Sequence, residues 1–326
     1  LTERLLYEAS FFLSLSRTLL DDRTFDAVMV FCPLVGAVGY AGLRRELYGE
    51  PLWLNVQDLS AEAARAGGIS TNDWLIRIMA AVQRWLFNRA DVWSSISPEM
   101  IERLRPMRSY DQPLLYVPNW LNTSMAQVIE KLPDKVGRLP DEPVKLLYAG
   151  NIGSKQDLLR CCRHLHRSDA AFFFQIHGDG SEADRVSTWI DESGEDRFGF
   201  GPFLPEADFI RAIHDTDYFL ISEKSGTGGS FIPSKMIPGM ATGTPILAIS
   251  DADSPLGREM HREEPGPWLS WTNLDELPAL LRETAAGTVP FVNWQENARS
   301  RATFYERDSV LDRMETSLRD LVTNRQ

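Results

Sequence analysis

Between residues 144 and 245, an apolar strand, a glycine-bearing turn and a helical segment follow one another three times. The strands are predicted at 144–149, 172–177 and 218–221, and the turns contain Gly150-Asn-Ile-Gly153, Gly178-Asp-Gly180 and Ser225-Gly-Thr-Gly-Gly-Ser230. Strands that alternate with helices form a parallel sheet. Glycines at strand ends let the backbone approach a phosphate, and the N–H groups of the next helix and a nearby lysine can bind it. The pattern predicts an α/β fold that binds a phosphorylated or nucleotide-linked ligand.

A second alternating series precedes this one. Its strands are predicted at 25–31, 51–56, 91–96 and 114–117, with a helix over 73–87. Prolines and charges over 123–143 predict a linker, and helical spacing over about 300–326 predicts a terminal helix that joins the first half. We therefore expect an N-terminal Rossmann-like domain at 1–122 and a C-terminal ligand-binding one at 144–299.

An apolar, helix-like segment at 5–15 precedes the first predicted strand. Such a segment can lie on a membrane surface or cover one face of a sheet. It lacks the basic face of an interfacial helix, so we expect it to cover the sheet.

Charge and cysteine content restrict the partners and the location. A net charge of −12 argues against a nucleic-acid backbone as the main partner. Three cysteines cannot form a disulfide framework, which favours a reducing compartment. The apolar runs are shorter than the roughly 18 residues that span a bilayer. We expect a cytoplasmic protein whose membrane contact is at most peripheral, at the inner face.

Five short motifs occur in a fixed order along the chain. They are Gln57-Asp-Leu59, Tyr116-Val-Pro-Asn-Trp120, Tyr148-Ala-Gly-Asn-Ile-Gly153 with Lys155-Gln156, Ile232-Pro-Ser-Lys-Met236 and Met240-Ala-Thr-Gly-Thr-Pro-Ile246. With the two Rossmann-like halves, they resemble the retaining glycosyltransferases of family 4, of the colanic-acid and exopolysaccharide type.

The resemblance implies a GT-B fold, in which two Rossmann-like domains with parallel sheets face each other across a cleft. It also implies metal-independent transfer of a hexose from a nucleoside-diphosphate sugar, with no further cofactor. The acceptor would be a saccharide or lipid-linked saccharide in surface polysaccharide biosynthesis.

The family's site residues can be placed on this chain. Lys155 would stabilise the leaving nucleoside diphosphate, unless it is an ordinary solvated lysine. Asp58 would orient an acceptor or donor hydroxyl, or else cap a helix ahead of Ser60-Ala-Glu62. Asp179 is expected to cap the turn after its strand. The donor-binding residues would be Gly150, Asn151, Gly153, Phe203, Pro205, Ser225, Gly226, Ser234 and Lys235, with Phe203-Leu-Pro205 against the base or forming only a turn.

The chain departs from the family at a pair of glutamates. Many members carry two glutamates separated by seven residues, where this chain has Ser230 and Pro238. Glu223 is the nearest carboxylate that could substitute, and simple solvation is its alternative. Asp251 and Asp253 are expected to be turn residues and not metal ligands.

Four predicted strands before the linker are fewer than the family uses. We therefore expect the N-terminal domain to be incomplete, with its missing strands supplied by an upstream segment or by a partner. Two alternative functions stay open. One is a non-catalytic nucleotide-sugar-binding or assembly protein, and the other is a nucleotide-sugar epimerase.

Overall fold

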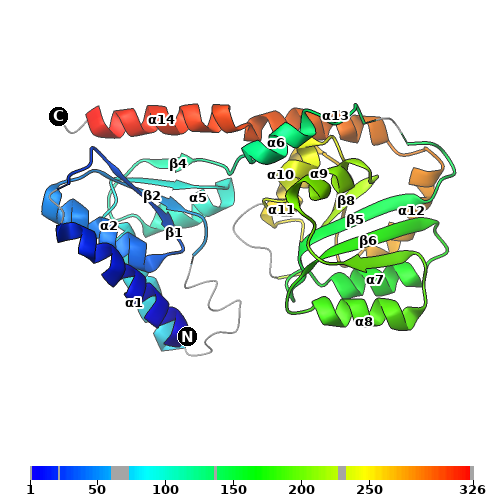
Figure 1. Cartoon of the computed structure of the whole chain (residues 1–326), viewed down its shortest axis with the longest axis horizontal. Coiled ribbons are helices and arrows are strands. Elements are labelled where there is room, and N and C mark those ends of the chain that lie inside the picture. Colours follow the sequence, from blue (N-terminus) through cyan, green and yellow to red (C-terminus); the bar gives the residue numbers. More distant parts are fainter. Residues whose placement is uncertain (1, 21–22, 60–72, 136–137, 227–232, 324–326) are drawn as a thin grey trace. The chain divides into compact units, whose positions relative to one another are not determined.

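The chain forms two compact units in a computed structural model that describes all residues except 1, 21–22, 60–72, 136–137, 227–232 and 324–326. One unit combines Leu1–Pro118 with Val310–Gln326, and the other is Asn119–Ser309. Each unit contains its own sheet (Figure 1).

The first unit contains a parallel sheet with the strand order β1-β2-β3-β4. Its strands are β1 (Val28–Cys32), β2 (Leu52–Val56), β3 (Val92–Ser95) and β4 (Leu114–Tyr116). They lie where the sequence pattern predicts strands. Their apolar side chains share one core with α2 (Val35–Tyr48), α4 (Asp73–Phe87) and α5 (Pro98–Leu104), which the short η2 (Arg105–Met107) follows.

The N-terminal helix α1 (Thr2–Ser16), followed by η1 (Arg17–Leu20), packs mainly against α2. The sequence predicted that this segment covers one face of the sheet, whereas its main partner is the helix α2. The two helices approach closely because α2 carries a glycine at the contact: a Cβ on Gly36 would lie 2.4 Å from the carbonyl oxygen of Glu8. The Gly36 N–H also donates to Glu8 Oε2 at 2.7 Å, which satisfies an N–H at the start of α2.

The second unit contains a parallel sheet with the order β10-β9-β8-β5-β6-β7. Its strands are β5 (Val144–Asn151), β6 (Phe172–Asp179), β7 (Phe198–Gly201), β8 (Tyr218–Ser222), β9 (Ile246–Ile249) and β10 (Trp268–Leu269). The chain builds the sheet outward from β5 in one direction, then returns to add β8 on the other side. The strand order therefore reverses between β5 and β8, which is the doubly wound arrangement of Rossmann folds.

Helices cover both faces of this second sheet (Figure 1). Side chains such as Leu146 and Tyr148 share a core with α7 (Leu158–His166), α8 (Ala183–Ser193), η3 (Leu274–Glu276) and α12 (Leu277–Ala285). Leu147 and Ala149 point to the opposite face, as alternation along a strand requires. There they meet α9 (Glu206–His214), α10 (Met236–Ala241), α11 (Pro255–Glu263) and α13 (Phe291–Ala302). All three cysteines are buried thiols.

The segment predicted as a linker, 123–143, belongs to the second unit and begins with the helix α6 (Thr123–Ile129). Half-buried Lys135 donates from Nζ to the carbonyl oxygen of His214 at 2.8 Å and to Thr244 Oγ1 at 2.7 Å. Arg138 pairs with Asp217 at 2.8 Å. Prolines and charges predicted a linker here. They gave no sign of α6, nor of basic side chains that bind carbonyls and a carboxylate of the second unit.

The chain ends in α13, η4 (Thr303–Tyr305) and α14 (Arg307–Thr323). Val310, Met314 and Leu321 are buried along α14, and the chain from Val310 onward groups with the first unit. The terminal helix predicted over about 300–326 was expected to join the first half of the chain, and the part that groups with the first unit begins at Val310. Among the described residues, the helices are too short or too polar to cross a membrane.

Candidate functional site

Two loops of the second unit meet at the carboxyl ends of β5 and β8. The backbone N–H of Lys224, just after β8, donates to the carbonyl oxygen of Lys155, just after β5, at 2.6 Å. In an open parallel sheet, ligands bind outside the carboxyl ends of the strands where the strand order reverses. The fold therefore places the predicted phosphate-binding turn at the point of the sheet where a ligand is expected.

The turn after β5 is held by neighbouring backbone. Ile152 N–H donates to the carbonyl oxygen of Asp179 at 2.8 Å, and the Ile152 carbonyl oxygen accepts from Glu182 N–H at 2.9 Å. Space for this contact exists because a Cβ on Gly180 would lie 2.5 Å from the Ile152 oxygen. Asp179 accepts from the Gly180 N–H at 2.7 Å, so it holds its own turn and does not cap α8.

Tyr148 and Lys235 lie against this turn. The Tyr148 hydroxyl donates to the carbonyl oxygen of Asn151, and the Lys235 ammonium lies 4.0 Å from the centre of the Tyr148 ring. A Cβ on Gly150 would lie 3.7 Å from Lys235 Nζ. Burial lowers the pKa of Lys235 to about 7, an effect that the charge of Glu223 partly opposes. A cation is thus held beside the glycine turn at a cost in desolvation.

Glu223 follows β8 and provides a buried carboxylate at the same edge. Burial raises its pKa to about 7, opposed by a hydrogen bond with Ser254 and by the charges of Lys235 and Lys155. Its Oε2 is buried and has no hydrogen-bond partner among the described residues. The structure therefore brings Glu223 to the predicted site, together with a buried oxygen that is able to accept a further hydrogen bond.

Lys155 itself is exposed, as are Ser154 and Asn151. Within the described part of the chain, the Lys155 side chain makes no hydrogen bond or ion pair, so its ammonium faces solvent. Gly153 N–H donates to Gln156 Oε1 at 3.0 Å, which closes the turn from Gly150 to Gln156.

The loop after β8 brings Ser225 and Gly226 to the same edge. Gly226 N–H donates to Asp251 Oδ2 at 2.7 Å, so the Asp251 carboxylate holds backbone. Ser234, exposed, directly precedes Lys235. Ser230, one of the two positions where the family has a glutamate, lies outside the described residues, whereas Pro238 is buried within α10. Among the residues that are described, His, Cys, Asp and Glu side chains form no group able to hold a metal ion.

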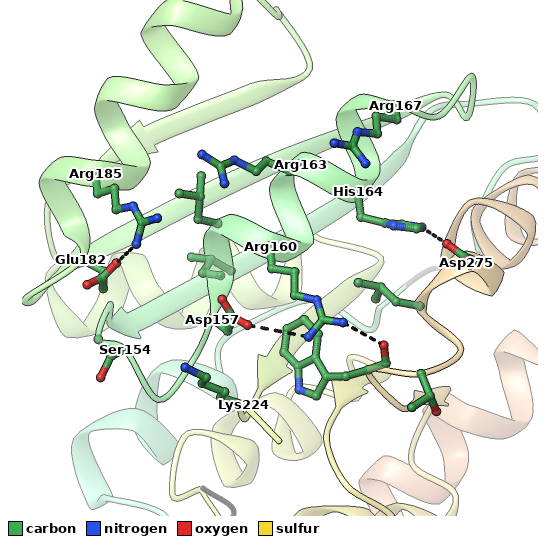
Figure 2. Close-up of a pocket in the computed structure, with 16 residues that line it drawn as sticks. Ser154, Asp157, Arg160, Arg163, His164, Arg167, Glu182, Arg185, Lys224 and Asp275 are labelled. Atoms are coloured by element: carbon green, nitrogen blue, oxygen red, sulfur yellow. Dashed lines mark hydrogen bonds and ion pairs between the residues drawn. The ribbon is translucent and has the colours of Figure 1, made fainter. Parts of the chain in front are cut away.

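A polar pocket of about 570 Å³ opens beside the turn and continues along α7 (Figure 2). Gly153, Ser154 and Lys224 line it near the turn, and Arg160, Arg163 and Arg167 line it along the helix. Arg160 donates to the carbonyl oxygen of Trp271 at 3.2 Å. Two other basic groups face acidic partners, Arg185 with Glu182 at 3.0 Å and His164 with Asp275 at 3.5 Å.

The arginines of this pocket differ in their pairing. Arg163 and Arg167 form no ion pair or side-chain hydrogen bond with any residue that the structure describes. Their spacing of four residues places them one above the other on the same side of α7. In a chain of net charge −12, this pocket is therefore a locally basic surface that suits an anionic ligand.

The remaining predicted site residues lie elsewhere. Phe203 and Pro205 follow β7, the edge strand. Because β6 lies between β5 and β7, these two strands are about 10 Å apart at ordinary strand spacing. The Phe203 ring is exposed, and Pro205 immediately precedes α9. Asp58 lies in the first unit after β2, where its carboxylate accepts from the Leu59 N–H at 2.8 Å. The helix cap ahead of Ser60, its alternative role, falls outside the described residues.

Sequence reasoning missed three contributors to this edge of the sheet. Tyr148 belongs to one of the five motifs, but the contact of its ring with Lys235 gave no signal, and neither did the role of the Lys224 backbone, because both depend on distant segments. The arginines of α7 did give one, since Arg160, Arg163 and Arg167 recur at helical spacing.

Sequence comparison finds similarity between this chain and known glycosyltransferases. Residues 2–120 match the model of the glycosyl transferase 4-like domain family. Over 267 residues, the chain is 25% identical to a putative colanic acid biosynthesis glycosyl transferase, WcaI, of Escherichia coli (strain K12). That match covers 78% of this chain, and the chain spans 65% of the length of that relative. These matches confirm the resemblance to family 4 glycosyltransferases.

Solved structures show the same fold at low sequence identity. A sucrose-phosphate synthase from Thermosynechococcus elongatus matches with a TM-score of 0.72 and 14% identity, over 94% of this chain and 76% of that one. HepE of Anabaena, solved in complex with UDP, matches with a TM-score of 0.68 and 14% identity, over 90% of this chain and 78% of that one. The chain therefore has an α/β, GT-B-like fold built from two Rossmann-like units.

Proposed function

We propose that this chain is a retaining glycosyltransferase that takes a hexose from a nucleoside-diphosphate sugar. The acceptor would be a saccharide or lipid-linked saccharide in the assembly of a surface polysaccharide. The match of residues 2–120 to a glycosyltransferase family and the similarity to a colanic acid enzyme support this proposal. The UDP bound to HepE, which shares the fold, supports a nucleotide-linked donor.

The observation that carries the proposal is the meeting of two lysine-bearing loops at the reversal of strand order. Lys155 follows β5, and the Lys235 ammonium lies against Tyr148 and the Gly150 turn. A diphosphate placed over this turn would face two cations and backbone that approaches without side-chain hindrance. Such an arrangement matches the chemistry of anion binding at a strand-to-helix turn.

The proposed reaction depends on orientation and on stabilisation of the leaving group. Negative charge develops on the diphosphate as its bond to the sugar breaks, and the exposed Lys155 ammonium would be positioned to stabilise that charge. Because burial lowers the pKa of Lys235 to about 7, a bound diphosphate would restore its full protonation near neutral pH. We propose that the reaction needs no metal ion.

We assign the missing carboxylate function to Glu223. The family's glutamate positions carry Ser230 and Pro238 here. Glu223 is half-buried at the same edge of the sheet, and its buried Oε2 is unpartnered among the described residues. A hydroxyl group of the donor would supply the hydrogen bond that this oxygen lacks. Asp58 of the first unit would orient the acceptor, so Asp58→Asn is expected to lower the turnover rate while donor binding is unchanged.

Binding and transfer are tested separately. Isothermal titration with UDP, GDP, ADP and TDP identifies the nucleotide, and a radiolabelled donor with a lipid-linked saccharide extract measures transfer, each with and without a chelator. Tight binding followed by labelled product, unaffected by chelation, is the expected result. Binding without transfer would favour a non-catalytic nucleotide-sugar-binding protein, and conversion of the donor sugar without acceptor would favour an epimerase. Absence of nucleotide binding would contradict the proposal itself.

A further inference from the structure

The helix α4 has apolar side chains on two opposite faces. Leu86 and Phe87 belong to the core of the first unit, and Ile76 is also buried. On the other side, four large apolar side chains remain exposed. They are Trp74, Ile78, Val82 and Trp85, with exposed fractions of 60, 48, 46 and 58%.

Helical geometry groups these exposed residues together. At about 100° per residue, Trp74, Ile78 and Trp85 fall within roughly 40° of one another, and Val82 lies beside them. Buried Ile76 and Phe87 lie on the far side of the helix axis, and buried Leu86 borders the stripe next to Val82. A helix with an apolar stripe toward the core needs no second stripe, so an exposed one of this size indicates an interaction surface.

Basic residues predominate around this face, where the one ion pair that the described residues form is that of Arg89 with Glu46 at 2.7 Å. From Trp74 to Arg89 the sequence has three arginines and no acidic residue, although the whole chain has a net charge of −12. Arg77 and Arg84 are exposed and lie on the same flank of the stripe, seven residues apart. Arg89 stacks on the Trp85 ring, with its guanidinium 4.1 Å from the ring centre.

We propose that this face of α4 lies on the surface of an anionic lipid bilayer. Indole rings favour the boundary between headgroups and acyl chains, aliphatic side chains between them enter the apolar layer, and arginines on the flank bind anionic headgroups. This is the combination of apolar and basic faces that the segment 5–15 lacks. A second copy of the chain fits less well, because a two-fold symmetric contact would bring the same arginines together.

Vesicle flotation of the whole chain tests this surface. No sugar donor is present, so a chain that does not bind vesicles would contradict this inference and leave the proposed sugar transfer unaffected. Vesicles of phosphatidylcholine alone are compared with vesicles that also contain phosphatidylglycerol. The wild-type chain is expected to float with the anionic vesicles only. Trp74→Ser with Trp85→Ser should weaken this binding at least tenfold, and Arg77→Gln with Arg84→Gln should remove the preference for anionic lipid.

The matched control changes two equally exposed apolar residues of the second unit, Leu139→Ser with Val292→Ser. It should float like wild type, and circular dichroism confirms that every variant is folded. Equal flotation by the tryptophan variant would overturn the proposal, as would a wild-type chain that ignores anionic vesicles. A dimer in light scattering that the tryptophan substitutions dissociate would show instead that a second copy covers the face.

Discussion

The ammonium nitrogen of Lys235 lies 4.0 Å from the centre of the Tyr148 ring, on the side of the glycine turn that follows β5. The ring comes from a core strand, and the cation comes from the residue before α10. Attraction to the ring compensates only part of the desolvation, since burial still lowers the pKa of Lys235 to about 7. The second unit therefore holds a positive charge beside the turn at the expense of folding stability.

Replacing Lys235 should separate stability from function. Because the folded pKa is lowered from 10.5 to about 7, the energetic cost of Lys235 is full below pH 7 and disappears as the pH rises toward 10.5. Lys235→Met should therefore raise the free energy of unfolding by about 1–3 kcal/mol at pH 6 and by less at pH 9. The same variant should weaken nucleoside-diphosphate binding about tenfold or more. Urea unfolding and calorimetry measure the two effects, with exposed Lys145→Met as control. Lower stability at pH 6 would contradict this account.

Lys155 should contribute to binding without contributing to folding. Its side chain is exposed, so Lys155→Ala should leave the melting temperature nearly unchanged. It should weaken nucleoside-diphosphate binding by about 1.5–3 kcal/mol, as expected for a hydrogen bond to a charged group. Arg163→Ala removes another exposed cation from the adjoining pocket and should leave the dissociation constant near that of wild type. If both variants weaken binding equally, the diphosphate extends along α7 and does not end at the turn.

Glu223 should make stability depend on pH. Burial raises its pKa from 4.5 to about 7, so the stability that its protonated form contributes is complete below pH 4.5 and is lost as the pH rises through 7. Glu223→Gln cannot ionise and should be more stable than wild type at pH 8, on the order of 1–3 kcal/mol, with little difference at pH 4. Urea unfolding at both pH values measures this, with the exposed Glu142→Gln as control. A difference that is the same at pH 4 and pH 8 would show that Glu223 does not titrate as described.

The sequence was sufficient to predict the four strands of the first sheet, the strands β5, β6 and β8 of the second, and the glycine turn after β5. Buried β8 is a nearly continuous apolar run, and β6 alternates buried apolar residues with exposed ones. Lys155 and Lys235 could be named from motifs of the resembling family. Contacts between distant segments could not be predicted, because the position of Lys235 over Tyr148 depends on how α10 packs on the sheet.

Two other features show the same limit of sequence reasoning. The apolar spacing of 73–87 predicted a helix, but both of its faces are apolar, so the pattern did not show which one meets the core. In the segment 123–143, the prolines indicated a linker. In the structure, Lys135 binds His214 at the end of α9 and Thr244 just before β9, and Arg138 pairs with Asp217 just before β8. Contacts between residues that are far apart in the sequence leave no periodic pattern in either segment, so they could not be predicted.

Gly178 should be the least replaceable glycine of the turn region. Its φ is 153°, and a Cβ there would lie 1.9 Å from the carbonyl oxygen of Gly150, which is backbone and cannot move without displacing the turn. Gly194, at the end of α8, is the matched control. Its φ is 63°, and a Cβ would meet no atom within 4 Å.

Gly194→Ala should therefore cost about 1 kcal/mol, the strain of a left-handed conformation alone. Gly178→Ala adds a backbone clash and should cost more than about 3 kcal/mol, together with a loss of nucleoside-diphosphate binding as the Gly150 turn shifts. Urea unfolding and calorimetry on both variants measure these effects. Equal stabilities for the two variants would mean that β5 and β6 separate easily at their ends, and the turn would then be less rigid than the proposed diphosphate site requires.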